Sequence, residues 1–346
     1  MSLHVPPPRV HTVTLNRVRA VPRELPQLLC RETATGTSQS PRGSFSPSTT
    51  ERAATVWFLL SPPSTRLFLY LGWLRIKCPQ PFRKGYTILI NTWKRNELLL
   101  ESVLHYSKCD GVDSIHVIWS EPEPPSDSLY DALSEAVDSN SKIGSNVDLI
   151  FDLNDEDSLN NRFQEIKDLN FDAIFSIDDD VIFPCKSVEF AFTVWKSAPE
   201  TMVGFVPRML WLDTSNSNSE HYFYGGWWSV WWTGTYDMVL SKAAFFHKKY
   251  LHLYSNQMPQ YIRNYVTKNR NCEDIAMAFL IANETGSPPI WVKGRIFEMG
   301  STGISSLGSH EERRTQCVND FTDVYGHMPL VSTNVKTIDS RSSWLW

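Results

Sequence analysis

The chain has 346 residues, of which 42% are hydrophobic, and a formal net charge of −5. This length and composition can bury a large core, and they exclude a disulfide-rich miniprotein, a collagen-like fibre and a wholly disordered chain. The average charge hides a boundary. The first 84 residues hold 12 basic and 3 acidic residues, whereas the remaining 262 hold 21 basic and 35 acidic ones. The acidic body argues against nucleic-acid binding as its main task, since nucleic-acid binders usually carry a basic face.

The basic arm, residues 1–84, is predicted to be mostly disordered. Residues 1–52 are rich in Pro, Ser and Thr and show no apolar period. Residues 53–74 are apolar, but Pro62 and Pro63 interrupt the run and break backbone hydrogen bonding. We therefore expect two short apolar pieces in a membrane interface, or an interrupted signal anchor, rather than one clean spanning helix.

From Gly85 onward, short apolar runs rich in β-branched residues alternate with segments of helical spacing. The predicted strands are Tyr86–Asn91, Ile115–Trp119, Val147–Phe151, Phe171–Ile177, 201–206 and 290–296. The predicted helices are Glu97–Lys108, Leu129–Val137, Leu159–Lys167, 187–197, 241–254, 259–268 and one that starts at Glu273. This alternation predicts an α/β domain with a parallel sheet and helices on both faces. The ligand of such a sheet binds outside the carboxyl ends of its strands.

Three adjacent acidic residues, Asp178, Asp179 and Asp180, lie at the carboxyl end of a predicted strand. Adjacent carboxylates repel one another, so they need a cation or basic groups nearby. Mg²⁺ and Mn²⁺ typically bind one or two carboxylates together with a substrate phosphate. The triplet therefore predicts a metal site, and a solvated acidic turn is the alternative.

Two further segments have both a structural and a functional interpretation. Arg162 has the planar fork that suits phosphate oxygens, and an exposed helix arginine is the alternative. Asn271 can cap a helix whose first turn contains Glu273 and Asp274. Acidic residues are favoured there because the amino end of a helix dipole is positive. In the functional interpretation, one of these two carboxylates is a catalytic group.

An aromatic loop is predicted over 207–236, and Tyr222–Trp232 concentrates its rings. Three interpretations stay open: a platform that stacks on sugars, a flap of the hydrophobic core, and a contact with lipid headgroups.

The six cysteines form no CxxC motif, so a zinc site is not predicted. Asn283 begins an N-glycosylation sequon. Walker A, GxGxxG, HExxH and GxSxG motifs are absent, which disfavours the enzyme classes that carry them.

Six strings in fixed order carry a resemblance to a known family over about residues 85–330. They are TILINTWKRNELL, NNRF with IFSIDDDVIF, FAFTVWKSAPETMVGFVPR, YDMVLSKAAFFHKKYLHLY, NCEDIAMAFL and ERRTQCVNDF. The chain resembles the exostosin-like, family 64 glycosyltransferases, and within them the plant subgroup of glycosylinositol phosphorylceramide mannosyltransferases. The resemblance implies a single GT-A domain over 85–330, followed by a tail at 331–346.

The resemblance also implies roles for individual residues. Asp178 and Asp179 match the acidic, nucleotide-sugar-binding motif, and Asp180 matches its Mn²⁺ ligand. The other matches are Arg95 and Arg162 on the nucleotide side, Asp274 as the catalytic carboxylate, Arg314 on the donor diphosphate, and Cys272 with Cys317 as a disulfide suited to an oxidising lumen.

The implied function is a retaining, metal-dependent transfer of mannose from GDP-mannose to a glycosylinositol phosphorylceramide in the Golgi lumen, at the membrane. The alternatives are a UDP-GlcNAc- or UDP-GalNAc-dependent transferase acting on a glycan, and a catalytically silent sugar- or lipid-binding protein. Two features depart from the family: the arm lacks a clean anchor, and SEPEPP follows the second strand where animal relatives carry Asn residues near the base. Nucleotide selectivity is therefore not inherited from those relatives.

Overall fold

A computed structural model describes residues 53–55, 73–75, 85–140, 147–214, 220–299 and 310–341. The chain divides into two units, Met1–Pro81 and Phe82–Trp346. In the first unit, β1 (Ala53–Thr55) pairs antiparallel with β2 (Trp73–Arg75). The rest of the arm, including Pro62 and Pro63, lies outside the described residues, so its disorder and its interrupted apolar run stay predictions.

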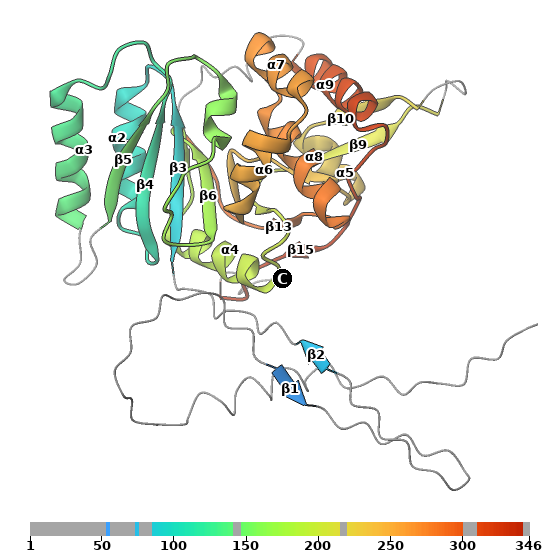
Figure 1. Ribbon diagram of the computed structural model, residues 1–346, viewed down its shortest axis with the longest axis horizontal. Coiled ribbons are helices and arrows are strands. Elements are labelled where there is room, and N and C mark those ends of the chain that lie inside the picture. Colours follow the sequence, from blue (N-terminus) through green and yellow to red (C-terminus); the bar gives the residue numbers. More distant parts are fainter. Residues whose placement is uncertain are drawn as a thin grey trace, which may run out of the picture. The chain divides into compact units, whose positions relative to one another are not determined.

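The second unit is built on one mixed sheet. Its strands are β3 (Tyr86–Thr92), β4 (Val112–Trp119), β5 (Asp148–Leu153), β6 (Ala173–Asp178), β8 (Val203–Gly204), β12 (Ala243–His247), β13 (Ile290–Val292) and β15 (Lys336–Thr337). These eight described strands lie in the order β15-β13-β8-β12-β6-β3-β4-β5 (Figure 1). The strands β5, β4, β3 and β6 run parallel, but β12 is antiparallel to both β6 and β8. The α/β class is confirmed, whereas a wholly parallel sheet is wrong at β12.

Helices cover both faces of the sheet, as predicted. They are α2 (Asn96–Tyr106), α3 (Asp127–Asn140), α4 (Cys185–Ser197), α6 (Lys249–Gln257), α7 (Gln260–Asn269), α8 (Glu273–Thr285) and α9 (His310–Tyr325). Successive side chains of a strand point to opposite faces. Ile88 and Ile90 of β3 accordingly pack with α2, α3 and α4, while Leu89 packs with the cluster that contains α6, α7, α8 and α9. In the part of the chain that the structure describes, no helix is both long and apolar enough to cross a membrane.

Two predicted helices are wrong. Residues 243–247 form β12, and α6 begins only at Lys249. The Ala-Ala-Phe-Phe run of β12 is fully buried, and an apolar run buried on both faces lacks the alternation that identifies a strand. Leu159–Lys167 forms one turn of 3-10 helix, η1 (Leu159–Phe163), because the backbone becomes extended at Gln164.

Part of the fold was not predicted as regular structure. The predicted loop 207–236 contains β9 (Pro207–Leu212), β10 (Tyr222–Gly225) and α5 (Trp227–Thr233), and β11 (Met238–Val239) follows it. The strands β10, β9 and β11 form a small antiparallel sheet of their own. The helix α9 was not predicted, and the predicted tail contributes β15 to the main sheet.

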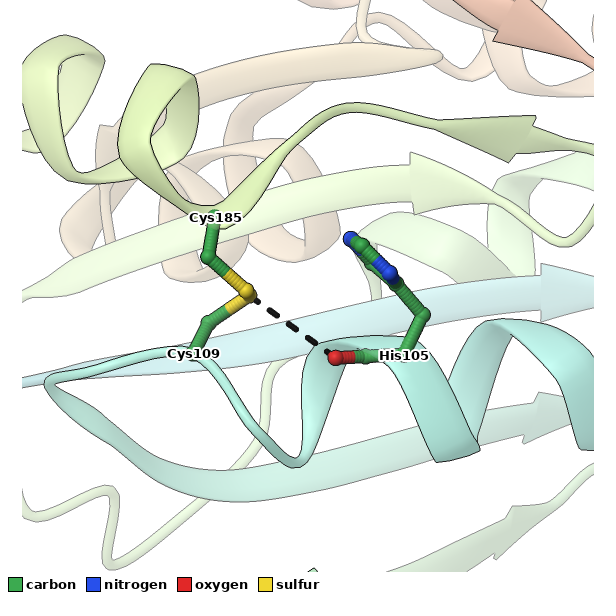
Figure 2. Close-up of side chains that lie close together, drawn as sticks. All are labelled: His105, Cys109 and Cys185. Carbon is green, nitrogen blue, oxygen red and sulfur yellow. Dashed lines mark hydrogen bonds between the residues drawn. A yellow bond between two sulfur atoms is a disulfide. The ribbon is translucent and has the colours of Figure 1, made fainter.

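Two disulfides join helices that are far apart in sequence. Cys109, after α2, is bonded to Cys185 at the start of α4, and Cys272 is bonded to Cys317 of α9. Figure 2 shows the first bond, with Cys109 Sγ 3.9 Å from the carbonyl oxygen of His105. Among the described residues, His105 and these two cysteines are the one group of three metal-type donors that lie close together. Since both sulfurs are in the disulfide, neither is the thiolate that zinc binding needs.

Candidate active site

A cavity of about 430 Å³ lies beyond the carboxyl ends of β3 and β6. It is lined by Asn91, Trp93, Arg95, Leu159, Arg162, Asp178, Asp180, Arg208, Tyr224, Leu240, Lys242, Arg270, Asn271, Glu273, Asp274, His310 and Arg314. Six predicted site residues are therefore gathered in one pocket, and Asp179 is the exception. A larger depression of about 680 Å³ beside η1, α6 and α7 contains none of them. We take the smaller cavity as the candidate site because it holds the convergent charged groups.

Arginines neutralise the acidic triplet. Asp178 ends β6, and the chain turns into β7 (Val181–Ile182), which pairs with β14 (Phe297–Glu298). Arg95 contacts two of the carboxylates, with Nη2 2.5 Å from Asp179 Oδ1 and Nη1 2.9 Å from Asp180 Oδ2. The third carboxylate, that of Asp178, is paired with Arg162. Basic groups thus supply the compensation that adjacent carboxylates need, and the solvated-turn alternative is wrong.

Asp179 lies behind the pocket wall, fully buried. Besides Arg95, it accepts a hydrogen bond of 2.7 Å from the Thr92 hydroxyl. Burial raises the pKa of Asp179 to about 7, although Arg95 and Thr92 act in the opposite direction. Asp179 holds the guanidinium of Arg95 from the buried side and is not among the residues that line the cavity. The prediction for Asp179 was a direct contact with the nucleotide sugar.

Arg162 is buried, so its interpretation as an exposed helix arginine is wrong. It lies on η1, which Ser158 caps by accepting a hydrogen bond from the backbone N–H of Asn160. Its guanidinium is paired with Asp178, and its Nη1 lies 4.0 Å from Glu273 Oε1. Its Nε is buried without a hydrogen-bond partner among the described residues, so the protein leaves one donor of this guanidinium unsatisfied.

Asp274 and Arg314 form the second wall of the pocket. Arg314 Nη2 lies 2.5 Å from both carboxylate oxygens of Asp274, and both side chains are buried. Burial would raise the pKa of Asp274, but the Arg314 guanidinium outweighs it and holds that pKa below its usual value. Arg314 also lies over the ring of Tyr224, 4.9 Å from its centroid. Asp274 is therefore an anion held in a fixed orientation.

The start of α8 differs from the predicted cap. The capping position belongs to Cys272, which has a left-handed backbone with φ of 75°, and no side chain caps the helix. The predicted cap, Asn271, instead accepts a hydrogen bond of 2.8 Å from the Cys272 N–H and one of 3.3 Å from Arg314 Nη1. The disulfide of Cys272 with Cys317 fixes this turn to α9. The two segments that carry Asp274 and Arg314 are therefore held together by a covalent bond as well as by the ion pair.

Glu273 was one of the two carboxylates considered as a catalytic group, although the resemblance favoured Asp274, and it lines the pocket too. Its side chain is 14% exposed. Burial, with the charge of Asp274, raises the pKa of Glu273 to about 7. Its position next to Asp274 was the one signal in the sequence, and the sequence alone does not show which of the two faces the cavity.

Several cations in the pocket were also missed. Lys242 lies 2.7 Å from Glu298, and Arg270 is paired with Asp157 and lies 5.0 Å from the Trp93 ring. The Arg208 guanidinium donates a hydrogen bond of 2.9 Å to the carbonyl oxygen of Pro207. With these, six Arg and Lys side chains line a pocket that has four carboxylates. The excess positive charge favours an anionic ligand.

Asn283, the predicted glycosylation site, lies far along α8 from the pocket residues, with an exposed side chain. Glycosylation there stays a prediction.

A mixed α/β sheet with a cationic pocket beyond the carboxyl ends of its parallel strands has its charged groups where sheets of this class bind ligands. The chain belongs to glycosyltransferase family 64, because its residues 86–344 match the Glycosyl transferase family 64 domain. It is therefore a glycosyltransferase, and the GT-A-type α/β arrangement is the one that the resemblance implied.

Two relatives and one solved structure show how this chain compares with known proteins. It is 64% identical to glycosylinositol phosphorylceramide mannosyl transferase 1 of Arabidopsis thaliana over 264 residues, 76% of this chain and 79% of that protein. It is 33% identical to human exostosin-2 over 262 residues, 72% of this chain but only 33% of exostosin-2. A mannosyltransferase from Pyrobaculum calidifontis, solved with GDP-Man and Mn²⁺, has a TM-score of 0.44 and 14% identity, covering 71% of this chain and 68% of that one.

Proposed function

We propose that the protein transfers mannose from GDP-mannose to a glycosylinositol phosphorylceramide, with retention of the anomeric configuration. The observation that carries this proposal is the 64% identity to the Arabidopsis mannosyl transferase over most of both chains. The pocket agrees with it, because its charged residues suit a sugar donor with a diphosphate leaving group.

The donor diphosphate is the proposed ligand of the cationic wall. Negative charge grows on the leaving group as its bond to the sugar breaks. Arg162, with its unpartnered Nε, and Arg314 line the cavity on opposite walls, and Arg95 lies beside Asp180. These guanidinium groups are already fixed by carboxylates, so they need little reorganisation to stabilise that charge.

The carboxylates of the pocket fit a divalent cation only if one of them binds it together with phosphate oxygens of the substrate. Asp179 and Asp180 share Arg95, Asp178 is paired with Arg162, and the three carboxylates do not form one of the close groups of metal-type donors among the described residues. Asp180 faces the cavity with a partly exposed carboxylate, and one carboxylate with substrate phosphate oxygens is a usual environment for Mg²⁺ or Mn²⁺. We propose Asp180 as the protein ligand of Mn²⁺, which when bound would neutralise charge on the leaving diphosphate.

Asp274 is proposed to act on the sugar side. Arg314 holds both of its oxygens and keeps it ionised. A fixed anion of this kind stabilises the positive charge that develops at the anomeric carbon of the sugar. The pairing supports this electrostatic role more than nucleophilic attack, since an attacking oxygen would first have to leave the guanidinium.

The acceptor and the cellular location follow from the same relationship. The printed name of the Arabidopsis relative specifies a glycolipid acceptor. The two disulfides suit an oxidising compartment, which supports the Golgi lumen as the proposed location and a membrane as the source of the acceptor.

A donor screen tests the proposal. Purified full-length protein is incubated with GDP-mannose, UDP-GlcNAc, UDP-GalNAc and UDP-glucose, and sugar release is measured with and without Mn²⁺. Selective use of GDP-mannose is expected. Selective use of a UDP-sugar would overturn the donor in favour of the exostosin-like alternative, and equal turnover without metal would remove the role of Asp180.

A further inference from the structure

The short helix α5 carries an exposed tryptophan face, made of Trp227, Trp228, Trp231 and Trp232. Their exposed fractions are 44%, 76%, 61% and 81%, whereas Val230 of the same helix is 1% exposed. At 100° per residue these four indoles share an arc of about 140°, and Val230 lies on the opposite side. The core-flap interpretation therefore holds for Val230 but not for the tryptophans, and large exposed apolar patches mark interaction sites.

The tryptophan face is held in place by the packing beneath it. A Cβ added to Gly225 would lie 2.6 Å from the Trp211 ring, so only glycine lets the chain turn this closely into α5. The helix ends at Gly234, which has a left-handed backbone. The indoles pack on one another, with ring centroids 6.0 Å apart for Trp228 and Trp231 and 6.2 Å for Trp231 and Trp232. They form a fixed surface and not four independent side chains.

The border of this surface carries a lysine on one side and a glutamate at the start of the helix. Trp227 packs edge-on against Trp291 of β13 at 5.5 Å, and Lys336 of β15 places its Nζ 4.5 Å from the Trp291 ring centroid. Val335, beside this lysine, is 61% exposed. The helix α5 itself contains no charged residue. A carboxylate, Glu311, lies beside Gly226 at the start of α5, where the helix dipole favours a negative charge.

We propose that the tryptophan face docks on a phospholipid bilayer, with its indoles at the boundary between headgroups and acyl chains and Lys336 at the lipid phosphates. Indole rings favour that boundary because they are apolar with one hydrogen-bond donor. A lysine at the edge complements anionic headgroups. The combination of exposed indole rings with a bordering cation is the one that suits the surface of a bilayer.

The elements that carry the tryptophan face also contribute residues to the active site. Tyr224 lines the pocket and precedes Trp227 by three residues, and Arg208 of β9 lines it too. In Figure 1, α5 lies with β9 and β10 on the side of the body away from α2 and α3. Docking would therefore hold the pocket beside the headgroup layer. This consequence rests on the proposed glycolipid acceptor, whereas the docking itself does not.

The test is vesicle binding by the full-length protein. Wild type is compared with a triple variant, Trp228→Ser, Trp231→Ser and Trp232→Ser, and with a matched control, Tyr130→Ser and Tyr261→Ser, which removes exposed aromatics from α3 and α7. Vesicles of phosphatidylcholine, with and without phosphatidylinositol, are sedimented with each protein. We expect the triple variant to bind at least about tenfold more weakly and the control to change less than about twofold.

Several outcomes decide the proposal. Equal binding by wild type and the triple variant would overturn it, even if the N-terminal arm binds vesicles in both. A wild-type dimer in solution that the triple variant loses, with no change in vesicle binding, would overturn it in favour of a second copy. Lys336→Glu is expected to weaken binding only to the phosphatidylinositol vesicles; no change would remove the role of that lysine. Sugar release from the donor without vesicles should be the same in all variants, so a failed donor screen is distinguishable from failed docking.

Discussion

At the residue scale, the pocket is organised by pairs in which a guanidinium holds a carboxylate. Arg95 with Asp180, Arg162 with Asp178 and Arg314 with Asp274 are all such pairs. Removing one member of a buried pair leaves an uncompensated charge, which is strongly destabilising, whereas a neutral isostere disturbs less. Isosteric amides are therefore the informative substitutions here.

Asp274→Asn is expected to keep donor binding and lose turnover. The amide preserves the shape of the side chain but not the negative charge facing the sugar, so turnover should fall by about 10²-fold or more. Donor affinity is measured by calorimetry and sugar release by a coupled assay. Asp131→Asn, at an exposed position of α3, serves as control. Unchanged turnover in Asp274→Asn would contradict its catalytic role.

Glu273→Gln is expected to change how stability depends on pH. The pKa of Glu273 is raised from 4.5 to about 7 in the fold, so its contribution to stability is full below pH 4.5 and is lost as pH rises through 7. As pH rises from 4.5 to 7, the free energy of unfolding of the wild type should fall by on the order of 1–3 kcal/mol more than that of the variant. Urea unfolding at pH 5 and pH 8, without donor, measures the difference. Parallel pH dependence in the two proteins would show that burial does not raise this pKa.

At the element scale, the sequence predicted best where a strand or helix has one local pattern. The first strands and α2, α3, α7 and α8 follow their apolar periods closely. It failed at β12 because Ala243–His247 contains no β-branched residue, whereas the equally buried runs of β3, β4 and β6 contain several. It failed at α9 because the helix is polar over much of its surface and is held by the disulfide of Cys317 and the pairing of Arg314. Those contacts are tertiary, and local sequence does not encode them.

The disulfide between α8 and α9 is expected to affect stability and donor binding together. Replacing Cys272 and Cys317 by Ala should lower the free energy of unfolding by about 2–4 kcal/mol. It should also lower the affinity for the donor, because Asp274 and Arg314 lie close to the bond in sequence. The control is the other disulfide: alanines at Cys109 and Cys185 should cost similar stability but keep donor affinity. Urea unfolding and calorimetry measure the two effects. Equal loss of donor affinity in both double variants would argue against a local role for the first bond.

At the scale of the whole molecule, the pocket joins two distant parts of the chain. One wall comes from residues near β3, η1 and β6, and the other from α8 and α9. The sequence predicted six charged residues of these walls, because family-specific strings surround them. It did not predict Arg208, Lys242, Arg270 or His310, since their place in the cavity depends on how distant elements pack.

Donor binding should depend on metal across this joint site. Full-length protein is expected to bind GDP in calorimetry with Mn²⁺, and either EDTA or Asp180→Ala should weaken binding by at least about tenfold. Asp148→Ala, an exposed carboxylate on β5, should have no effect. Binding of equal strength without metal would refute the proposed ligand role of Asp180.

The separation of the two disulfides along the chain has a consequence for biosynthesis. Both Cys109 and Cys185 precede Cys272 in the chain, so vectorial synthesis would allow these two pairs to form one after the other without competing. Arg95 and Arg162 precede their carboxylate partners in the chain by less than 90 residues and are synthesised before Asp274. The arginine partner of Asp274, Arg314, is synthesised 40 residues after it. A nascent chain or a premature stop before α9 would leave Asp274 without its arginine. The second wall of the pocket is therefore complete only after α9 has been synthesised and has paired Arg314 with Asp274.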